Sequence, residues 1–186
     1  MNNIVDITKY NPLAKDKFFF DANIWLYLFC PIGDYKKDVI AKYDKFLKKI
    51  IESKSSIFIS SLILSEIFNR WARLEYNILK GEEPSKYHDY KRDYRCTKSY
   101  DKQVKDIKMV VEKHIMKVSK RIDDKFSSIP LDKLFENMGN YDFNDNYFLT
   151  IANLESFKIV THDSDFASFK TPVFILTANE KVLRRI

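Results

Sequence analysis

The stretch KFFFDANIWLYLF, residues 17–29, decides the fold. Three consecutive phenylalanines, Phe18 to Phe20, form a short apolar run that is typical of a buried strand. The run ends at Asp21, and the apolar residues that follow Asn23 continue for longer than a strand needs. We therefore expect a buried strand, a turn at Asp21 and then a helix.

The rest of the chain repeats this alternation. Apolar runs predict three further strands, at 57–59, 158–161 and 173–176. Helical spacing and capping residues predict helices at 39–51, from Ser60 or Ser61 to Ile78, from Asp142 or Asn144 to Leu154, and after a capping box formed by Thr177 and Glu180. Strands that alternate with helices predict an α/β fold, a three-layer α/β/α sandwich with a mainly parallel central sheet.

The composition is that of one globular domain covering residues 1–186. The chain is 45% hydrophobic and 31% charged, with a formal net charge of +6, which excludes disorder and collagen-like classes. Residues 82–125 carry thirteen Lys or Arg and nine Asp or Glu. Val104, Ile107 and Val111 keep a helical spacing within them, so we interpret residues 82–128 as a charged helical hairpin inserted into the domain.

Several locations and classes are excluded by the same sequence. The longest uncharged apolar stretch, residues 24–32, is far shorter than the ~20 residues of a membrane-spanning helix. The N-terminal residues lack the pattern of a secretory signal, so we expect a cytoplasmic protein with no membrane contact. Two cysteines, Cys30 and Cys96, are too few for a disulfide scaffold.

Acidic residues follow or flank the predicted strands. Asp21 follows the first strand, Asp163 and Asp165 follow the strand at 158–161, Asp145 opens a helix, and Glu66 lies near the start of another. Ligand sites in open parallel sheets form beyond the carboxyl ends of the strands. These acids from distant segments could therefore meet at one edge of the sheet.

Structural roles compete with this hypothesis. Asp145 and Asp163 could each cap a helix or a turn, and Glu66 is spaced to pair with Arg70 across one helical turn. Asp21 fits a structural role least well, because it lies between three phenylalanines and an apolar helix. A carboxylate buried there requires a cation.

Three segments carry a resemblance to a known family: FFFDANIWLYLF, SSLILSEIFNR and DFNDNYFLTIANLESFKIVTHDSDF. In this order they resemble the acidic motifs of PIN-domain ribonucleases. The resemblance places Asp21, Glu66, Asp145 and Asp163 at the family's catalytic, metal-binding acids, with Asp165 as the second acid of the last motif and Thr161 and Asn23 as supporting residues. Asp142, three residues before Asp145, is an alternative for the third acid.

Oxygen ligands without a Cys/His set suit Mg²⁺ or Mn²⁺. The resemblance implies a metal-dependent endoribonuclease that hydrolyses RNA phosphodiester bonds. It also implies either the toxin of a toxin–antitoxin pair, with an antitoxin-like protein as partner, or an RNA-processing enzyme, with RNA as substrate in both cases and a homodimer as the default assembly. The inserted residues 82–128 set this chain apart from the shorter toxins of the family.

Alternatives remain open. A non-catalytic PIN-like module could use the same fold to dock RNA or a protein partner, and a phosphoacceptor receiver domain also places an Asp after a strand. A DNA-cleaving relative is not distinguished by residue type. Within the insertion, Tyr87, Tyr90 and Tyr94 could stack on RNA bases beside Lys91 and the neighbouring arginines, or could pack the hairpin.

Overall fold

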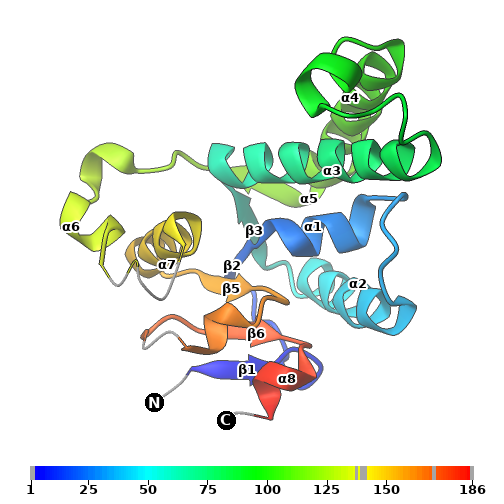
Figure 1. Ribbon diagram of the computed structural model, residues 1–186. Helices are drawn as coiled ribbons and strands as arrows, with labels where there is room; N and C mark the ends of the chain where they lie inside the picture. The colour runs from blue at the N-terminus through cyan, green and yellow to red at the C-terminus, as the bar shows by residue number, and fades with distance from the viewer. Residues whose placement is uncertain (1–2, 137, 139–141, 169–170, 185–186) are drawn as a thin grey trace.

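The computed structural model describes residues 3–136, 138, 142–168 and 171–184. These residues form one sheet in which every neighbouring pair of strands is parallel (Figure 1). The order across the sheet is β1-β6-β5-β2-β3-β4. The strands are β1 (Ile4–Asp6), β2 (Lys17–Phe20), β3 (Ser56–Ile59), β4 (Ser119–Arg121), β5 (Lys158–Val160) and β6 (Ile175–Thr177).

Helices connect and cover these strands. The α-helices are α1 (Ala22–Phe29), α2 (Lys37–Glu52), α3 (Ser61–Glu82), α4 (Lys98–Val110), α5 (Met116–Val118), α6 (Leu131–Leu134), α7 (Phe143–Glu155) and α8 (Glu180–Leu183). Shorter helical turns are the π-helical η1 (Tyr90–Tyr94) and η2 (Val111–Ile115) and the 3₁₀-helical η3 (Phe126–Ser128) and η4 (Asp165–Ser168). Across the described ranges, no helix combines the length and the apolar character that a bilayer span requires.

The three phenylalanines of β2 explain the layers. Successive residues of a strand point to opposite faces. Phe18 packs edge-on against Phe46 of α2 at 5.5 Å between ring centroids, whereas Phe19 packs against Phe148 of α7 at 5.8 Å. Figure 1 accordingly shows α1 and α2 on one side of the sheet and α7 on the other. The predicted α/β/α sandwich is confirmed.

The carboxyl ends of the three central strands lie level with one another. Phe20 of β2 is in register with Val160 of β5, and the N–H of Asp21 donates to the Val160 carbonyl at 3.0 Å. The N–H of Thr161 donates in turn to the carbonyl of Leu176 in β6 at 3.1 Å. The chain therefore leaves all three strands at the same edge of the sheet, which is where the acidic residues were expected to meet.

The sequence analysis missed both edge strands. β1 and β4 have three residues each, and β4 has the sequence SKR, which carries no apolar signal at all. Both are strands because their backbones pair with β6 and β3. The segment 82–128 therefore contributes a strand to the sheet as well as helices.

The C-terminal helix also begins later than expected. Thr177 is the last residue of β6 and does not cap a helix; its Oγ1 accepts a hydrogen bond from the N–H of Asn179 at 3.0 Å. Asn179 is the N-cap of α8, and its Oδ1 accepts from the N–H of Lys181 at 3.0 Å. The predicted capping box of Thr177 and Glu180 is therefore wrong.

Within residues 82–128, the tyrosines form a small core. The C-terminal half of α3 packs on α4 and η1, and in Figure 1 this part extends away from the sheet. Tyr76, Tyr87 and Tyr94 are buried together, and the guanidinium of Arg73 covers the ring of Tyr90 at 4.6 Å. The hypothesis that Tyr87 and Tyr94 stack on RNA bases is therefore wrong, because both rings are occupied by packing.

A second buried aspartate lies at the amino end of β2. Asp16 is 5% exposed and forms an ion pair with Lys158 at 2.8 Å. It also accepts hydrogen bonds from the Tyr10 hydroxyl at 2.8 Å and from the Leu13 N–H at 2.9 Å. Burial raises the pKa of Asp16, but the hydrogen bonds from Lys158, Leu13 and Tyr10 outweigh it, and the pKa lies below its usual value. This carboxylate is fully paired.

Replacing Asp16 by Asn should lower the free energy of unfolding by about 1.5–3 kcal/mol, the usual contribution of hydrogen bonds to a charged group. Because the folded pKa is depressed, this contribution is present above the unfolded pKa and is lost as the pH falls. Urea unfolding at pH 7 and at pH 3 measures both effects.

Asp44→Asn is the matched control, since it breaks an exposed ion pair of similar length, 2.7 Å, with Lys48 on the surface of α2. It should change the free energy of unfolding by no more than about 0.5 kcal/mol. A comparable loss of unfolding free energy in both variants would show that the burial of Asp16 contributes nothing to stability.

Candidate functional site

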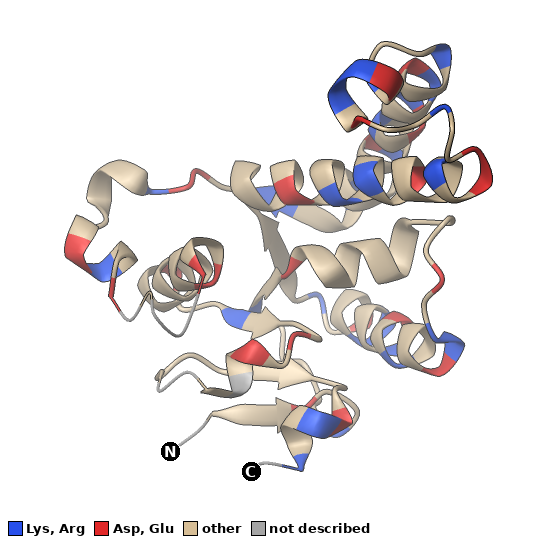
Figure 2. Cartoon of the chain, in the orientation of Figure 1, with Lys and Arg blue, Asp and Glu red and all other residues tan. Residues whose placement is uncertain are grey.

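Four acidic residues from distant segments surround the carboxyl end of the sheet. Asp21 follows β2, Glu66 lies near the start of α3, Asp145 is in the first turn of α7, and Asp163 follows β5. Figure 2 shows acidic segments at the starts of α1, α3 and α7 around this region. Their charges act on one another: those of Glu66 and Asp163 raise the pKa of Asp21, and those of Asp21, Asp163 and Glu66 raise the pKa of Asp145.

Asp21 is held by one of its two oxygens. Its Oδ2 accepts hydrogen bonds from the hydroxyl of Thr161 at 2.6 Å and from the amide of Asn23. Within the described residues, no donor reaches Oδ1. Thr161 and Asn23 are themselves buried, so they fix the orientation of the carboxylate. Their predicted role as supporting residues of Asp21 agrees with this geometry.

Glu66 likewise has one carboxylate oxygen with a partner and one without. Its Oε1 accepts from the Arg70 guanidinium at 3.2 Å, which is the ion pair that the spacing predicts. Its Oε2 is buried and has no hydrogen-bond partner in the described part of the chain. A buried charged oxygen without a partner is costly, so this oxygen favours a proton or a cation.

The start of α7 distinguishes Asp142 from Asp145. Asp142 is the N-cap, and its Oδ1 accepts from the N–H of Asp145 at 2.8 Å. Asp145 is half-buried, and the hydrogen bonds of the described residues leave its carboxylate unpaired. Of the two candidates for the third acid, Asp142 therefore has the structural role and Asp145 has the free carboxylate.

The turn after β5 ties Asp163 to Asp21. The N–H of Asp163 donates to Thr161 Oγ1 at 2.9 Å, and this is the hydroxyl that donates to Asp21. Asp163 Oδ1 accepts from the N–H of Asp165 at 3.0 Å. The side chain of Asp165 is exposed at the start of η4. Asp165, predicted as a metal ligand, thus contacts the site through its backbone.

Crowding of these acids changes their protonation. Burial raises the pKa of Asp21 to about 6, aided by the charges of Glu66 and Asp163 and opposed by Thr161 and Arg70. Burial also raises the pKa of Asp145 to about 8, and the neighbouring acids add to the effect. The pKa of Glu66 is raised by burial although Arg70 opposes the shift.

A divalent cation fits this arrangement in charge and in donor type. The unpaired oxygens all belong to carboxylates, the ligands that Mg²⁺ and Mn²⁺ prefer. Over the described ranges, however, no three acidic, histidine or cysteine side chains are grouped closely enough to hold a metal ion together. The fit is therefore to an ion that keeps several of its waters and takes few direct protein ligands, as Mg²⁺ usually does.

A cavity of about 890 Å³ opens beside the acids, and the sequence analysis did not anticipate it. It lies between the α1–α2 connection, the start of α2, the turn after β5 and α8, and it includes Arg70 and Asp163. Its lysines and tyrosines come from four segments with no shared motif. The only sequence signal was the basic C-terminal helix.

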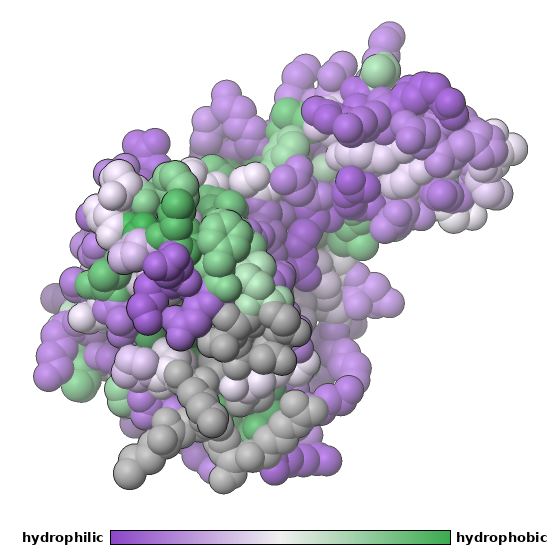
Figure 3. Space-filling model, turned by 60° about the vertical axis from the view of Figure 1, so that its left-hand side comes forward, coloured by the Kyte–Doolittle hydropathy of each residue, from purple (hydrophilic) through white to green (hydrophobic). Residues whose placement is uncertain are grey.

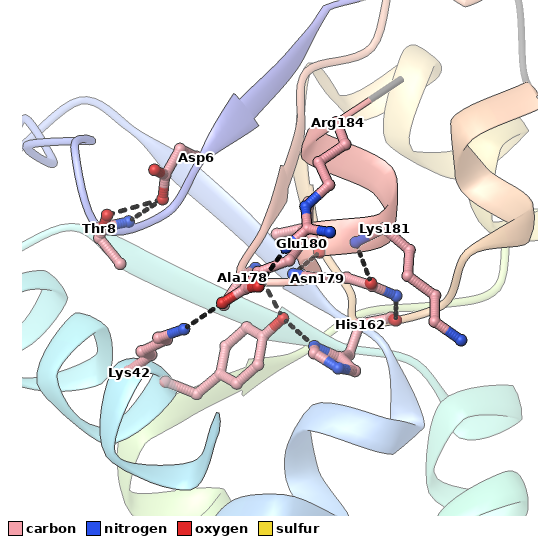
Figure 4. Close-up of polar contacts among 11 residues, drawn as sticks. Asp6, Thr8, Lys42, His162, Ala178, Asn179, Glu180, Lys181 and Arg184 are labelled. Atoms are coloured by element: carbon pink, nitrogen blue, oxygen red, sulfur yellow. Dashed lines mark hydrogen bonds and ion pairs between the residues drawn. The ribbon is translucent and has the colours of Figure 1, made fainter. Parts of the chain in front are cut away.

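His162 lines this cavity and is half-buried in the turn after β5. Its Nδ1 lies 3.0 Å from the hydroxyl of Tyr43, and its backbone carbonyl accepts from Asn179 Nδ2 at 2.7 Å (Figure 4). Burial lowers the pKa of His162, and the charge of Lys42 adds to this. The ring is thus half-buried and fixed in the cavity wall.

Comparisons with known proteins add little. No protein-family model matches the chain, and no curated protein matches it. Among solved structures, the crystal structure of PAE2754 from Pyrobaculum aerophilum is similar over 96% of this chain and 94% of that chain, with 17% sequence identity and a TM-score of 0.41. Similarity at this level supports no argument, so the resemblance to PIN-domain ribonucleases rests on the sequence motifs.

Replacing Asp145 by Asn should stabilise the metal-free protein at high pH. A group whose folded pKa is raised contributes stability that is fully present below its unfolded pKa and is lost as the pH rises through the folded value, here about 8. The variant escapes this loss, so its melting temperature should exceed that of the wild type by about 2–4 °C at pH 8.5 and much less at pH 5.5.

Asp101→Asn is the control, because Asp101 also lies in the first turn of a helix, α4, but is exposed and far from the acids. It should shift the melting temperature equally at both pH values. Scanning calorimetry in a chelating buffer measures both variants, and a pH-independent effect of Asp145→Asn would contradict the crowding of these carboxylates.

Proposed function

We propose that the protein is a metal-dependent endoribonuclease in which Asp21, Glu66, Asp145 and Asp163 bind Mg²⁺ or Mn²⁺. The observation that carries the proposal is the buried, unpartnered Oε2 of Glu66 among carboxylates with raised pKa values. Burial disfavours the ionised forms of Asp21 and Asp145, as their raised pKa values show, and a bound cation would stabilise them. The preference for RNA comes from the resemblance to PIN-domain ribonucleases.

Asp21 is the central residue of this proposal. Thr161 and Asn23 hold Oδ2, which leaves Oδ1 as the oxygen available to a cation. The bound ion would activate a water, orient the scissile phosphate and stabilise the leaving oxygen. Glu66 and Asp163 flank Asp21 and would bind the ion directly or through its waters.

Arg70 is placed to receive the substrate. Its guanidinium bonds Glu66, is half exposed and lines the cavity beside the acids. Arginine binds phosphate oxygens through paired N–H donors. In the proposed reaction Arg70 contacts a non-bridging oxygen of the scissile phosphate and offsets the repulsion between RNA and the carboxylates.

A non-catalytic module is the second candidate. One observation favours it: in the described residues the carboxylates are not grouped as a ready-made metal site. In that case the acids would hold an ion or a partner without hydrolysis. The toxin role, the antitoxin-like partner, the homodimer and the cytoplasmic location remain predictions that rest on the sequence.

Two aspartates at opposite ends of β2 provide a matched test. Asp21→Asn should reduce cleavage of a labelled single-stranded RNA by about 100-fold or more, since even residues that only support a metal ligand contribute 10–100-fold. Asp16→Asn should destabilise the fold but leave cleavage by the folded protein unchanged. Gel electrophoresis of the products with Mn²⁺, with and without a chelator, measures the activity.

Isothermal titration with Mn²⁺ separates the two candidate functions. Binding without cleavage by the wild type would refute the ribonuclease and favour the non-catalytic module. An Asp21→Asn protein as active as the wild type would refute the assignment of Asp21, and cleavage that survives the chelator would refute the metal.

A further inference from the structure

The cavity beside the acids has the chemistry of a single-strand binding site. It joins cationic side chains to the half-buried rings of Tyr27, Tyr35 and His162, and it continues to Arg70 and Asp163 at the candidate metal site. The chemistry proposed above uses Arg70 and Asp163 of this cavity but none of its lysines or tyrosines. Its volume of about 890 Å³ lies at the upper end of the range of roughly 300–1,000 Å³ for small-molecule sites, so it has room for more than one small group.

The aromatic wall is rigid. The ring of Tyr27, in α1, lies 4.6 Å from Tyr35 and 5.5 Å from His162 between centroids. Tyr35 in turn lies over Gly33, where an added Cβ would come within 2.0 Å of the tyrosine ring. The hydrogen bond between His162 Nδ1 and the Tyr43 hydroxyl fixes the remaining side. Rings that are held in this way present a surface on which an unstacked base can stack.

The charged part of the lining holds both signs: the basic residues Lys36, Lys42, Arg70, Lys181 and Arg184 and the acidic residues Asp34, Asp38, Asp163 and Glu180. Lys42 and Arg184 both pair with Glu180, at 3.6 and 3.3 Å, so these three charges are largely committed to one another (Figure 4). Lys36 and Lys181 line the same cavity, are exposed, and form no ion pair with a described acidic residue. These two ammonium groups are therefore available to neutralise phosphates.

The surface on the other side of the acids is apolar. Phe126, Leu131, Phe135 and Met138, from the segment around α6, are all exposed, and Figure 3 shows hydrophobic residues gathered on that face. An apolar surface does not neutralise a phosphate backbone. The distribution of charge thus favours one direction of approach, over α2 and α8.

We propose that this cavity binds the single-stranded segment of RNA next to the scissile phosphate, with one base against Tyr27 and with phosphates at Lys36 and Lys181. The inference rests on the proposed ribonuclease function and adds to it the path of the strand. The proposed ligand is an unpaired strand, because a base inside a duplex cannot reach the ring of Tyr27.

The test measures binding in the Asp21→Asn background with Mg²⁺, where RNA is not consumed. Fluorescence anisotropy with a labelled oligouridylate should show that Lys36→Gln with Lys181→Gln flattens the slope of log affinity against log salt by about 1.4, since each cation–phosphate contact in a single strand contributes about 0.7. Tyr27→Leu should weaken binding about ten-fold, whereas Tyr27→Phe, which keeps the ring, should not.

Lys102→Gln with Lys105→Gln is the control for charge. Both lysines are exposed on α4, within the inserted segment and away from the cavity. An equal loss in this control would overturn the cavity as the site and would assign RNA binding to the insertion or to net charge. A tighter complex with duplex RNA, or no binding at all, would also overturn the proposal and favour a protein partner for the cavity.

Failure of this inference is distinguishable from failure of the proposed function. If the lysine and tyrosine variants cleaved RNA as well as the wild type does, the strand path alone would be overturned. Binding that depends on the cavity, in a chain that never cleaves RNA with Mn²⁺, would instead refute the ribonuclease.

Discussion

A carboxylate buried directly after three buried phenylalanines is the constraint on which the rest of the structure depends. Asp21 is 6% exposed, and the acids nearest to it carry the same sign of charge. The Thr161 hydroxyl and the Asn23 amide satisfy one oxygen, and Arg70 offsets part of the charge. The remainder can be relieved by a proton or by a cation, so protonation would compete with the proposed metal binding at this position.

The two buried aspartates of the β2 region show that burial alone does not identify a functional acid. Asp16 and Asp21 are buried to nearly the same extent, at 5% and 6% exposure. Lys158 and two further donors bring the pKa of Asp16 below its usual value, whereas the pKa of Asp21 rises to about 6. Asp16 is thus stable as an anion with the partners that the fold already supplies, and Asp21 is not. The difference lies in the partners that each end of the sheet supplies.

The sequence predicted what depends on periodicity and on order along the chain. The phenylalanines of β2, the amphipathic α2 and the acids after the strands were recognised because each signal lies within one segment. β4 was missed, since SKR becomes a strand only through its pairing with β3. The cavity was missed for a similar reason: Lys36, Tyr27 and Lys181 are separated in sequence and are brought together by the parallel connections.

The position of Arg70 links the two halves of the proposed site. It is bonded to Glu66 Oε1 and lines the cavity, so a phosphate that enters from the cavity competes with Glu66 for the guanidinium. Loss of that partner would leave both oxygens of Glu66 free for a cation. A cation on Glu66 would in turn weaken its hold on Arg70 and release the guanidinium for phosphate. Because coupling between two binding events is reciprocal, RNA and metal should each strengthen the binding of the other under the proposed function. Under the proposed function, the acidic site and the cavity would therefore act as one RNA-binding unit.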